Sequence, residues 1–428
     1  MKSIEVPALA RVEGEGGLYI GLQDGKAVEI RLDIYEPPRF FEGFLRGRFL
    51  QEVPDITARI CGICPVAYQM SSALALENAL DIKVMPEVRA LRRLMYCGEY
   101  IESHALHIYM LQAPDLFGKD SAFELAAIAP EVVKNALRLK KIGNQVLSAI
   151  GGRSIHPVNV CVGGFYSWPE AAALKSLLPD LRWGLNAAID CVSWAVTLPY
   201  PSLEIDYEFV ALHHPAEYGV IDGEIWSSKG LKLSIADYEK GYIEEHVQRS
   251  NALHGRTIDG QTYLVGPLAR ISLNHAQLLP AAQKALKASK VKLPIRNPYK
   301  SLIARAIELV QFFEEAINIV EAYNPKGPPH VELQLRAGEG SGATEAPRGL
   351  LYHRYKIDDK GLVQFAKITP PTAQNLPRIE ADLLAMAPKL TKLEEADATR
   401  TAEHLVRAYD PCISCATHFL KLKVEELD

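Results

Sequence analysis

The sequence has no apolar run approaching the roughly 20 residues that a membrane-spanning helix requires. Its first residues, MKSIEVPALARVEGEG, lack the apolar core of a secretory signal peptide. It also has no excess of positive charge, because 52 aspartates and glutamates outweigh 47 lysines and arginines. These absences argue against a membrane protein, an exported protein and a nucleic-acid-binding protein. We therefore predict a cytoplasmic protein with no membrane span and no nucleic-acid partner.

Cysteine is also scarce, with seven in 428 residues, too few for a disulfide framework. Cys97, Cys161 and Cys191 lie among apolar or small residues, so we expect reduced core cysteines there. The other four form two pairs, Cys61–Cys64 and Cys412–Cys415, and two residues separate the thiols in each pair. Both sulfurs of a pair can therefore point at one metal.

Together the two pairs offer four thiolates, a donor set that favours zinc, iron–sulfur clusters, copper(I) or nickel. The halves of a zinc finger or ribbon are usually about 12–20 residues apart. Here 347 residues lie between Cys64 and Cys412, which favours a reaction centre over a local folding element. From the spacing alone, structural zinc and redox disulfides are alternatives.

The pairs stand in the segments RICGICPVAYQMSSALALENAL and DPCISCATH. These segments resemble the two metal-binding motifs of the nickel–iron hydrogenase large subunit, and the resemblance runs through nearly the whole chain. It implies a fold that is mainly α with smaller β parts (α+β), with a core of long helices, an N-terminal antiparallel hairpin and β-rich inserts. It also implies the catalytic subunit of an enzyme that cleaves hydrogen reversibly into protons and electrons.

The resemblance implies a nickel–iron centre whose iron carries carbon monoxide and cyanide. Cys61 and Cys412 would be terminal nickel ligands, and Cys64 and Cys415 would bridge nickel to iron. Hydrogen is a negligible acid, so a metal must take the hydride while a base takes the proton. A terminal thiolate such as that of Cys412 can receive the proton. Glu13, in the segment RVEG, would be the next acceptor, although alone it would be interpreted as a solvated carboxylate.

Arg348 lies in the segment APRG, whose arginine overhangs the open metal position in the family. It would orient hydrogen bonds to cyanide or act as a base, and an ordinary pKa above about 12 makes base action the harder role. By the same resemblance, Asp115 and Asp410 would hold its guanidinium.

Two positions depart from the family pattern. Tyr68 stands where the family often has histidine, and Pro371 stands where many members have a hydroxyl residue. Thr372 is therefore expected to supply the hydroxyl to a cyanide. His156, in the segment GGRSIHP, matches a histidine that lies beside the partner subunit's nearest iron–sulfur cluster.

A magnesium site is also implied, with Glu42, the carbonyl of Lys367 and His418 as ligands. His418 matches the residue at which the family's precursor is cleaved after nickel insertion. Residues 419–428 are therefore expected to be removed by a maturation protease, and nickel chaperones are expected partners.

Periodicity and turn residues divide the chain into four parts. They are a β-hairpin region at 1–36, a helical core with the first cysteine pair at 37–202, a β-rich insert at 203–273, and a mixed part at 274–418 with the arginine loop and the second pair. The expected strands are 18–22, 27–32 and 331–336, with a further hairpin turning at 358–361. The expected helices are 66–80, 86–113, 130–149, 168–198, 278–290 and 298–323, with further helix up to Tyr409.

Three local patterns bear on chemistry. Cys64 is predicted at a helix N-terminus, where unpaired N–H groups and the helix dipole favour a thiolate. His104 and His107 share a helix face and are either a metal pair or hydrogen-bonded core histidines. The glycine-rich stretch 337–343 has no lysine at the spacing of a phosphate-binding loop, so phosphate binding has little support.

Electrons must leave singly through iron–sulfur clusters that this chain cannot build, so an iron–sulfur small subunit is an expected partner. The length and N-terminus resemble members that work with flavin- and NAD(P)-reducing subunits and further iron–sulfur subunits. The alternatives are a hydrogenase with another acceptor (deazaflavin, heterodisulfide or ferredoxin), a non-catalytic quinone-site subunit, and a zinc-stapled scaffold.

Overall fold

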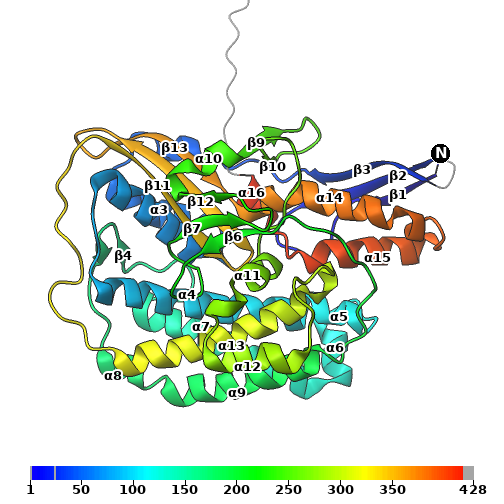
Figure 1. Ribbon diagram of the computed structural model, residues 1–428, viewed down its shortest axis with the longest axis horizontal. Coiled ribbons are helices and arrows are strands. Elements are labelled where there is room, and N and C mark those ends of the chain that lie inside the picture. The colour runs from blue at the N-terminus through cyan, green and yellow to red at the C-terminus, as the bar shows by residue number, and fades with distance from the viewer. Residues whose placement is uncertain (1, 24–25, 418–428) are drawn as a thin grey trace, which may run out of the picture.

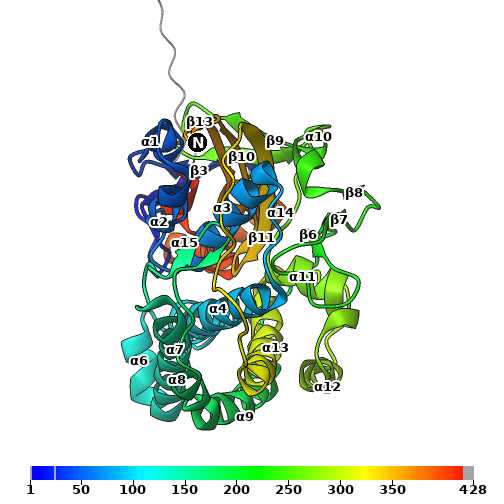
Figure 2. The same ribbon diagram turned by 90° about the vertical axis from the view of Figure 1, so that its left-hand side faces the viewer.

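Long helices form a bundle along one side of the molecule, and the main sheet lies above them (Figures 1 and 2). The computed structural model describes residues 2–23 and 26–417. The helices are α1 Phe41–Leu45, α2 Val53–Ala58, α3 Pro65–Leu80, α4 Pro86–Leu106, α5 Ala113–Leu116, α6 Ala122–Ile128, α7 Pro130–Gly151, α8 Ala171–Lys175, α9 Leu178–Ala195, α10 Tyr238–Gly241, α11 Pro267–Asn274, α12 Pro280–Ser289, α13 Ser301–Ala322, α14 Pro371–Leu390, α15 Glu395–Ala408 and α16 Ile413–Ala416. The strands are β1 Lys2–Val6, β2 Gly16–Gln23, β3 Lys26–Ile34, β4 Val160–Cys161, β5 Gly164–Phe165, β6 Val210–His213, β7 Glu224–Ser227, β8 Lys232–Leu233, β9 Tyr242–His246, β10 Leu253–Thr257, β11 Gly338–Ala346, β12 Gly349–Ile357 and β13 Val363–Thr369.

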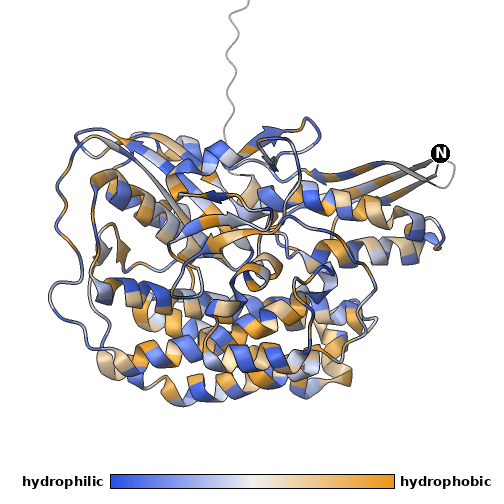
Figure 3. Cartoon of the chain, in the orientation of Figure 1, coloured by the Kyte–Doolittle hydropathy of each residue, from blue (hydrophilic) through white to orange (hydrophobic). Residues whose placement is uncertain are grey.

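Helix α4 is the centre of the bundle and packs against α7 and α13, while α13 also packs against α9. Gly143 of α7 allows a close approach of the two helices, because a Cβ there would lie 2.6 Å from the carbonyl oxygen of Gly98 in α4. Hydrophobic and hydrophilic residues alternate along the bundle helices, so each can bury one face (Figure 3). Arg92, which α4 buries, pairs with Glu77 at 2.6 Å.

The main sheet is antiparallel in the order β11–β12–β13, and α3 lies against β11. The glycine-rich stretch 337–343, where phosphate binding has little support from the sequence, forms most of β11. Glycine is required there because a Cβ at Gly340 would lie 2.2 Å from the carbonyl oxygen of Ala75. The prediction of a strand at 331–336 is wrong: this segment is largely exposed and joins no ladder among the described residues.

The N-terminal sheet has three antiparallel strands in the order β1–β2–β3. The predicted hairpin of β2 and β3 is confirmed, whereas β1 was not predicted. Between β1 and β2, Glu13 forms a parallel bridge with Cys412. This bridge joins the N-terminal region to the segment of the second cysteine pair.

The predicted β-rich insert contains the short strands β6 to β10 and packs on the main sheet. Val210, Ile225 and Tyr238 of the insert share a small core with Leu350 and Tyr352 of β12. This small core fixes the insert beside the turn that joins β11 and β12.

Most predicted helices are confirmed within a few residues, often with proline in the first turn as at Pro65 and Pro86. The prediction at 168–198 is divided into α8 and α9. The segment predicted as one helix at 86–113 consists of α4 and a π-helical turn, His107–Gln112, that leads into α5. Among the described residues, no helix is both long and apolar enough to cross a membrane.

Candidate metal centre

The four paired cysteines converge at one buried point. Cys61 and Cys64 lie between α2 and α3, and Cys412 and Cys415 lie at the start of α16. The Sγ atoms are 3.5 Å apart for Cys61 and Cys412, 3.9 Å for Cys64 and Cys415, and 2.8 Å for Cys412 and Cys415. All four sulfurs lie within 4.8 Å of one another, so the predicted convergence is confirmed.

The backbone around the first pair favours a thiolate at Cys61 more than at Cys64. Cys61 Sγ accepts the N–H groups of Ile63 and Cys64, both at 3.3 Å. Cys64 caps α3 as predicted, but the first free N–H groups of α3 are not available to its sulfur. Glu99 takes those of Val66 and Ala67 at 2.7 and 3.2 Å. The expectation that the helix terminus stabilises a Cys64 thiolate is therefore wrong.

Arg39 links the two cysteine motifs. Its Nη2 donates to the carbonyl oxygens of Ile60 and Ser414, each at 2.6 Å. Its backbone N–H donates to the carbonyl oxygen of Thr417 at 2.8 Å. One side chain therefore holds the residue before the first pair against the second pair.

Glu13 lies on one side of the cluster. Its Oε2 accepts the thiol of Cys412 at 3.0 Å and the N–H of Ser414 at 3.1 Å. The Glu13 carbonyl accepts the N–H of Ile413 at 2.9 Å. The side chain is only partly buried, so this carboxylate joins the cluster to the surface.

Arg348 lies at the tight turn between β11 and β12 and is fixed by Asp410. Its Nε donates to the Asp410 carbonyl at 2.8 Å, and its Nη2 to Oδ1 at 2.9 Å. Burial alone would lower the pKa of Arg348, but Asp410 and the nearby cysteines hold it well above its ordinary value. The guanidinium is therefore a permanent cation, which argues against a role as a base.

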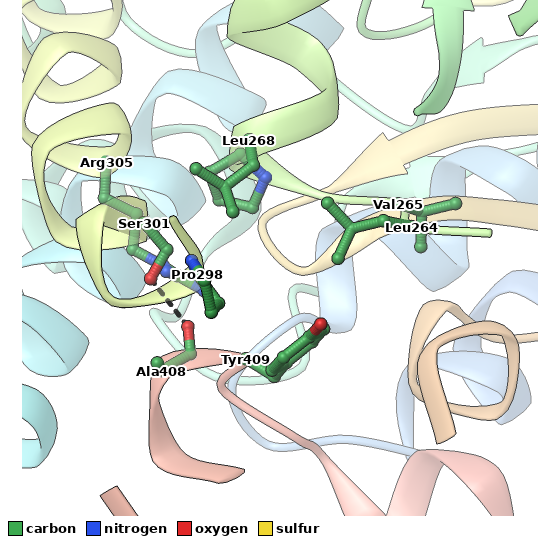
Figure 4. A pocket seen from close by; sticks show the side chains of 9 residues that line it. Leu264, Val265, Leu268, Pro298, Ser301, Arg305, Ala408 and Tyr409 are labelled. Carbon is green, nitrogen blue, oxygen red and sulfur yellow. Dashed lines mark hydrogen bonds between the residues drawn. The ribbon is translucent and has the colours of Figure 1, made fainter. Parts of the chain in front are cut away.

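Arg305 faces Asp410 from the other side, with Nη2 3.6 Å from Oδ2. A narrow pocket lies next to it, between α11, α13 and the end of α15 (Figure 4). In this pocket the Ser301 hydroxyl donates to the Ala408 carbonyl at 2.6 Å. Burial lowers the pKa of Arg305 to about 10. Its Nε and Nη1 have no hydrogen-bond partner among the described residues.

Thr372 and Tyr68 approach the cluster from α14 and α3. Thr372 Oγ1 accepts the N–H of Cys412 at 2.9 Å, which leaves its hydroxyl hydrogen able to donate elsewhere. Burial, followed by the charge of Cys415 and Cys64, raises the pKa of Tyr68. The Tyr68 hydroxyl therefore remains protonated beside the cluster.

Asp115 does not hold Arg348, so that prediction is wrong. Its carboxylate accepts Arg11 Nη2 at 2.6 Å and the Arg407 Nη2 and Nε at 2.7 and 2.8 Å. The sequence could not show which of several arginines would face this aspartate. Its position instead ties the segment before Glu13 to the end of α15.

The two histidines of α4 and its π-helical turn do not converge on a metal. His104 Nε2 is 2.7 Å from Glu308, and His107 Nε2 is 2.8 Å from the Arg407 carbonyl. Of the two alternatives, the hydrogen-bonded core histidines are the ones observed. His156 lies elsewhere, with Nδ1 2.8 Å from the carbonyl of Ala58 at the end of α2.

The proposed magnesium ligands are only partly within the described residues. Glu42 Oε1 accepts the N–H of Ile368 at 2.8 Å, in the peptide group to which the Lys367 carbonyl belongs. The Lys367 side chain, which is not the predicted ligand group, pairs with Glu239 at 2.9 Å. His418 and the predicted extension 419–428 lie outside the described residues.

Three residues of this centre were not singled out from the sequence. Arg39 and Glu99 act through the backbone of distant segments, and no local signal marks them. Arg305 was visible in principle, because it stands with Glu308 in the apolar helix SLIARAIELVQFF. A charge inside such a run must find a partner in the core.

The donor set fits a bound metal group. Burial raises the pKa of Cys412, so four thiolates this close together require a cation to balance their charge. Arg348 Nη1 is also buried and meets no acceptor among the described residues. A group bound by the cysteines with acceptor atoms of its own would complete that hydrogen bonding.

A helix bundle and sheet around a buried four-thiolate centre define an oxidoreductase of the hydrogenase type. The sequence pattern of the nickel-dependent hydrogenases matches residues 39–135 and 253–418, and the chain belongs to that family. The large-subunit fold implies a small-subunit partner.

The chain is 35% identical to sulfhydrogenase 1 subunit alpha of Pyrococcus furiosus, over 99% of this chain and 100% of the relative. It is 27% identical to the NAD-reducing hydrogenase HoxS subunit beta of Cupriavidus necator, over 98% of this chain and 95% of the relative. Among solved structures it is similar to an NAD+-reducing [NiFe]-hydrogenase in the H2-reduced state. That match has a TM-score of 0.89 and 26% identity and covers 98% of this chain and 100% of the other.

Proposed function

We propose that this chain is the catalytic subunit of a nickel–iron hydrogenase whose proton leaves through Cys412 and Glu13 and whose electrons reach NAD(P). The observation that supports this most is the contact of Cys412 Sγ with Glu13 Oε2 at 3.0 Å, at the edge of a buried four-sulfur cluster. A nickel–iron centre, when bound there, supplies an acceptor for the electron pair of hydrogen.

The residues of the chain accept the proton and transfer it toward the surface. Cys412, as a terminal ligand with Cys61, accepts it at Sγ. Glu13 takes it from Cys412 and passes it outward, because the carboxylate is partly exposed. Cys64 and Cys415 would complete the set of four thiolates that hold the centre.

Arg348 and Thr372 bind the outer atoms of the centre. We assign these atoms to carbon monoxide and cyanide on iron, of which cyanide accepts hydrogen bonds. The buried Nη1 of Arg348 and the free hydroxyl hydrogen of Thr372 support this assignment. Asp410 accepts two hydrogen bonds from Arg348 and so fixes the orientation of its guanidinium.

The surface near the first cysteine pair is proposed to receive the iron–sulfur small subunit. Ile155, Val158 and Tyr166 are each at least half exposed there, and His156 lies among them in sequence. Large exposed apolar residues of this kind are typical of protein interfaces. Cys97, Cys161 and Cys191 are buried in separate elements, so they cannot hold a cluster together.

We further propose flavin- and NAD(P)-reducing subunits, additional iron–sulfur subunits and a cytoplasmic location. The similarity to an NAD+-reducing hydrogenase supports the acceptor, and seven free cysteines support a reducing compartment. A magnesium ion held by Glu42, the Lys367 carbonyl and His418 also belongs to the proposal. We also propose that a maturation protease cleaves the chain after His418 once nickel chaperones have acted. Intact-mass measurement of nickel-loaded protein would test this cleavage.

Metal analysis with one variant pair tests the function. The complex should contain nickel and iron in about equal amounts and exchange hydrogen isotopes with water. Cys412→Ser should abolish exchange, whereas Cys191→Ser, at a buried thiol outside the cluster, should leave it unchanged. Zinc alone would indicate a scaffold, absence of metal would indicate a quinone-site subunit, and full activity of the Cys412 variant would refute the ligand assignment.

A further inference from the structure

The turn that carries Arg348 has little freedom of its own. Pro347 and Arg348 alone connect β11 to β12, since Ala346 pairs directly with Gly349. On one side the turn meets the segment before α11, where a Cβ on Gly266 would lie 2.7 Å from the Arg348 carbonyl oxygen. A small shift of this backbone therefore moves the guanidinium at the metal centre.

Arg270, in α11, binds the backbone that leads into this turn. Its Nη1 donates to the carbonyl oxygen of Ala346 and its Nη2 to that of Pro347, both at 2.9 Å. These carbonyls belong to the two residues directly before Arg348. Arg270 thus fixes the base of the Arg348 side chain, while Asp410 fixes its guanidinium.

The remaining donors of Arg270 are also used. Nε and Nη2 donate to the two carboxylate oxygens of Glu308 at 2.6 and 2.9 Å, and Nη1 also donates to Glu345 at 3.0 Å. Its five N–H groups therefore meet five acceptors, and all three side chains are fully buried. Arg305, one turn before Glu308, has two nitrogens without such partners, so burial alone does not produce this arrangement.

We propose that Arg270 is a positioning residue for the hydrogenase reaction, which holds the Arg348 turn at the distance from the metal centre that turnover requires. This inference rests on the proposed function. Lysine cannot replace it, because one ammonium group cannot reach two carbonyls and two carboxylates in the fixed planar geometry of a guanidinium. Misplacement of a catalytic group by about 1 Å can cost roughly 100-fold in rate.

The test is a double-mutant cycle measured on the whole complex by hydrogen–deuterium exchange with water. Arg270→Lys should lower exchange about 100-fold while nickel content stays at the wild-type level. In an Arg348→Lys background the same change should cost less than about 3-fold, because the group that Arg270 positions is already lost. The infrared bands of the iron ligands should shift in Arg270→Lys in the direction seen for Arg348→Lys.

Arg92→Lys is the matched control. Arg92 is equally buried and forms a bidentate pair with Glu77, but it contacts no residue of the turn. Arg92→Lys should change isotope exchange equally in the wild-type and Arg348→Lys backgrounds. The infrared bands of the iron ligands in this variant should stay at the wild-type positions. If the Arg270→Lys protein does not bind nickel, the cycle is measured with Glu308→Gln in its place. That change weakens the hydrogen bonding of the same Arg270 guanidinium.

The outcomes separate this inference from the function on which it rests. A wild-type complex without nickel or without exchange refutes the proposed function before any variant is compared. With an active wild type, equal losses in both backgrounds, or wild-type exchange in the Arg270 variant, overturn the role of Arg270 alone.

Discussion

At the scale of single residues, the carboxylate of Glu13 accepts from both Cys412 Sγ and the N–H of Ser414. Glu13→Gln keeps the shape of this side chain but removes its ability to titrate. We expect nickel to stay bound while hydrogen turnover and isotope exchange fall by about 10²–10⁴-fold, the usual contribution of a positioned acid or base. Metal analysis measures the bound nickel, and isotope exchange on the same preparation measures the loss of activity.

Glu15→Gln is the control for that change, because Glu15 is two residues away and exposed. It should exchange isotopes at the wild-type rate. Normal exchange in the Glu13 variant would mean that protons leave the centre by another route.

Residues in short contiguous motifs could be placed from the sequence, and residues that act across the fold could not. The four cysteines, Glu13 and Arg348 each stand in a distinctive segment of a few residues. Arg270 and Arg39 bind backbone carbonyls more than 70 and 370 residues away in the chain, respectively. No local pattern specifies such contacts, because they join segments far apart in the chain. The partner of Asp115 was predicted wrongly for the same reason.

At the scale of elements, the contact of β11 with α3 positions the helix that begins at the first cysteine pair. Gly342 faces α3 so closely that a Cβ would lie 2.5 Å from the Ser71 carbonyl and 2.6 Å from the Ala75 N–H. Gly342→Ala should therefore separate strand and helix and lower the free energy of unfolding by about 1–3 kcal/mol. Chemical denaturation measures this as a lower transition midpoint.

Gly21→Ala, in β2, is the comparison for that variant. The nearest atoms to a Cβ there belong to the Tyr19 side chain at 3.2 Å, which can move. We expect a change below about 1 kcal/mol. Equal destabilisation of both variants would show that glycine matters for strand flexibility and not for the approach to α3.

The same strand shows where elements could not be predicted. Glycine weakens a strand by local preference, so GEGSGA indicates a loop, whereas contact with α3 selects glycine for its missing side chain. Conversely, VELQLR alternates as a strand does but joins no ladder in the part of the chain that the structure describes. The helices were predicted well because their periodicity and proline starts are local features.

At the scale of the whole molecule, the bundle and the metal centre depend on different contacts. The bundle is held by packing within α4, α7, α9 and α13, including the contact of Tyr100 with Phe312, whose ring centroids are 4.0 Å apart. The centre is held by segments from both ends of the chain that meet through Glu13, Arg39 and the cysteines. Loss of the metal should therefore affect the junction of the chain ends without loosening the bundle.

Nickel-free protein tests this separation by amide hydrogen exchange, which reports local opening segment by segment. Without a cation, the four thiols can be buried together only as largely protonated, weakly bonded groups. We expect exchange at 59–64 and 410–417 to quicken by at least about tenfold, equivalent to roughly 1.4 kcal/mol of lost local stability. Amides of α4 and α13 should change by less than about twofold, because neither helix supplies a ligand. Faster exchange throughout the chain would show that the metal stabilises the entire fold, and unchanged exchange at both cysteine segments would show that protein contacts alone hold the centre closed.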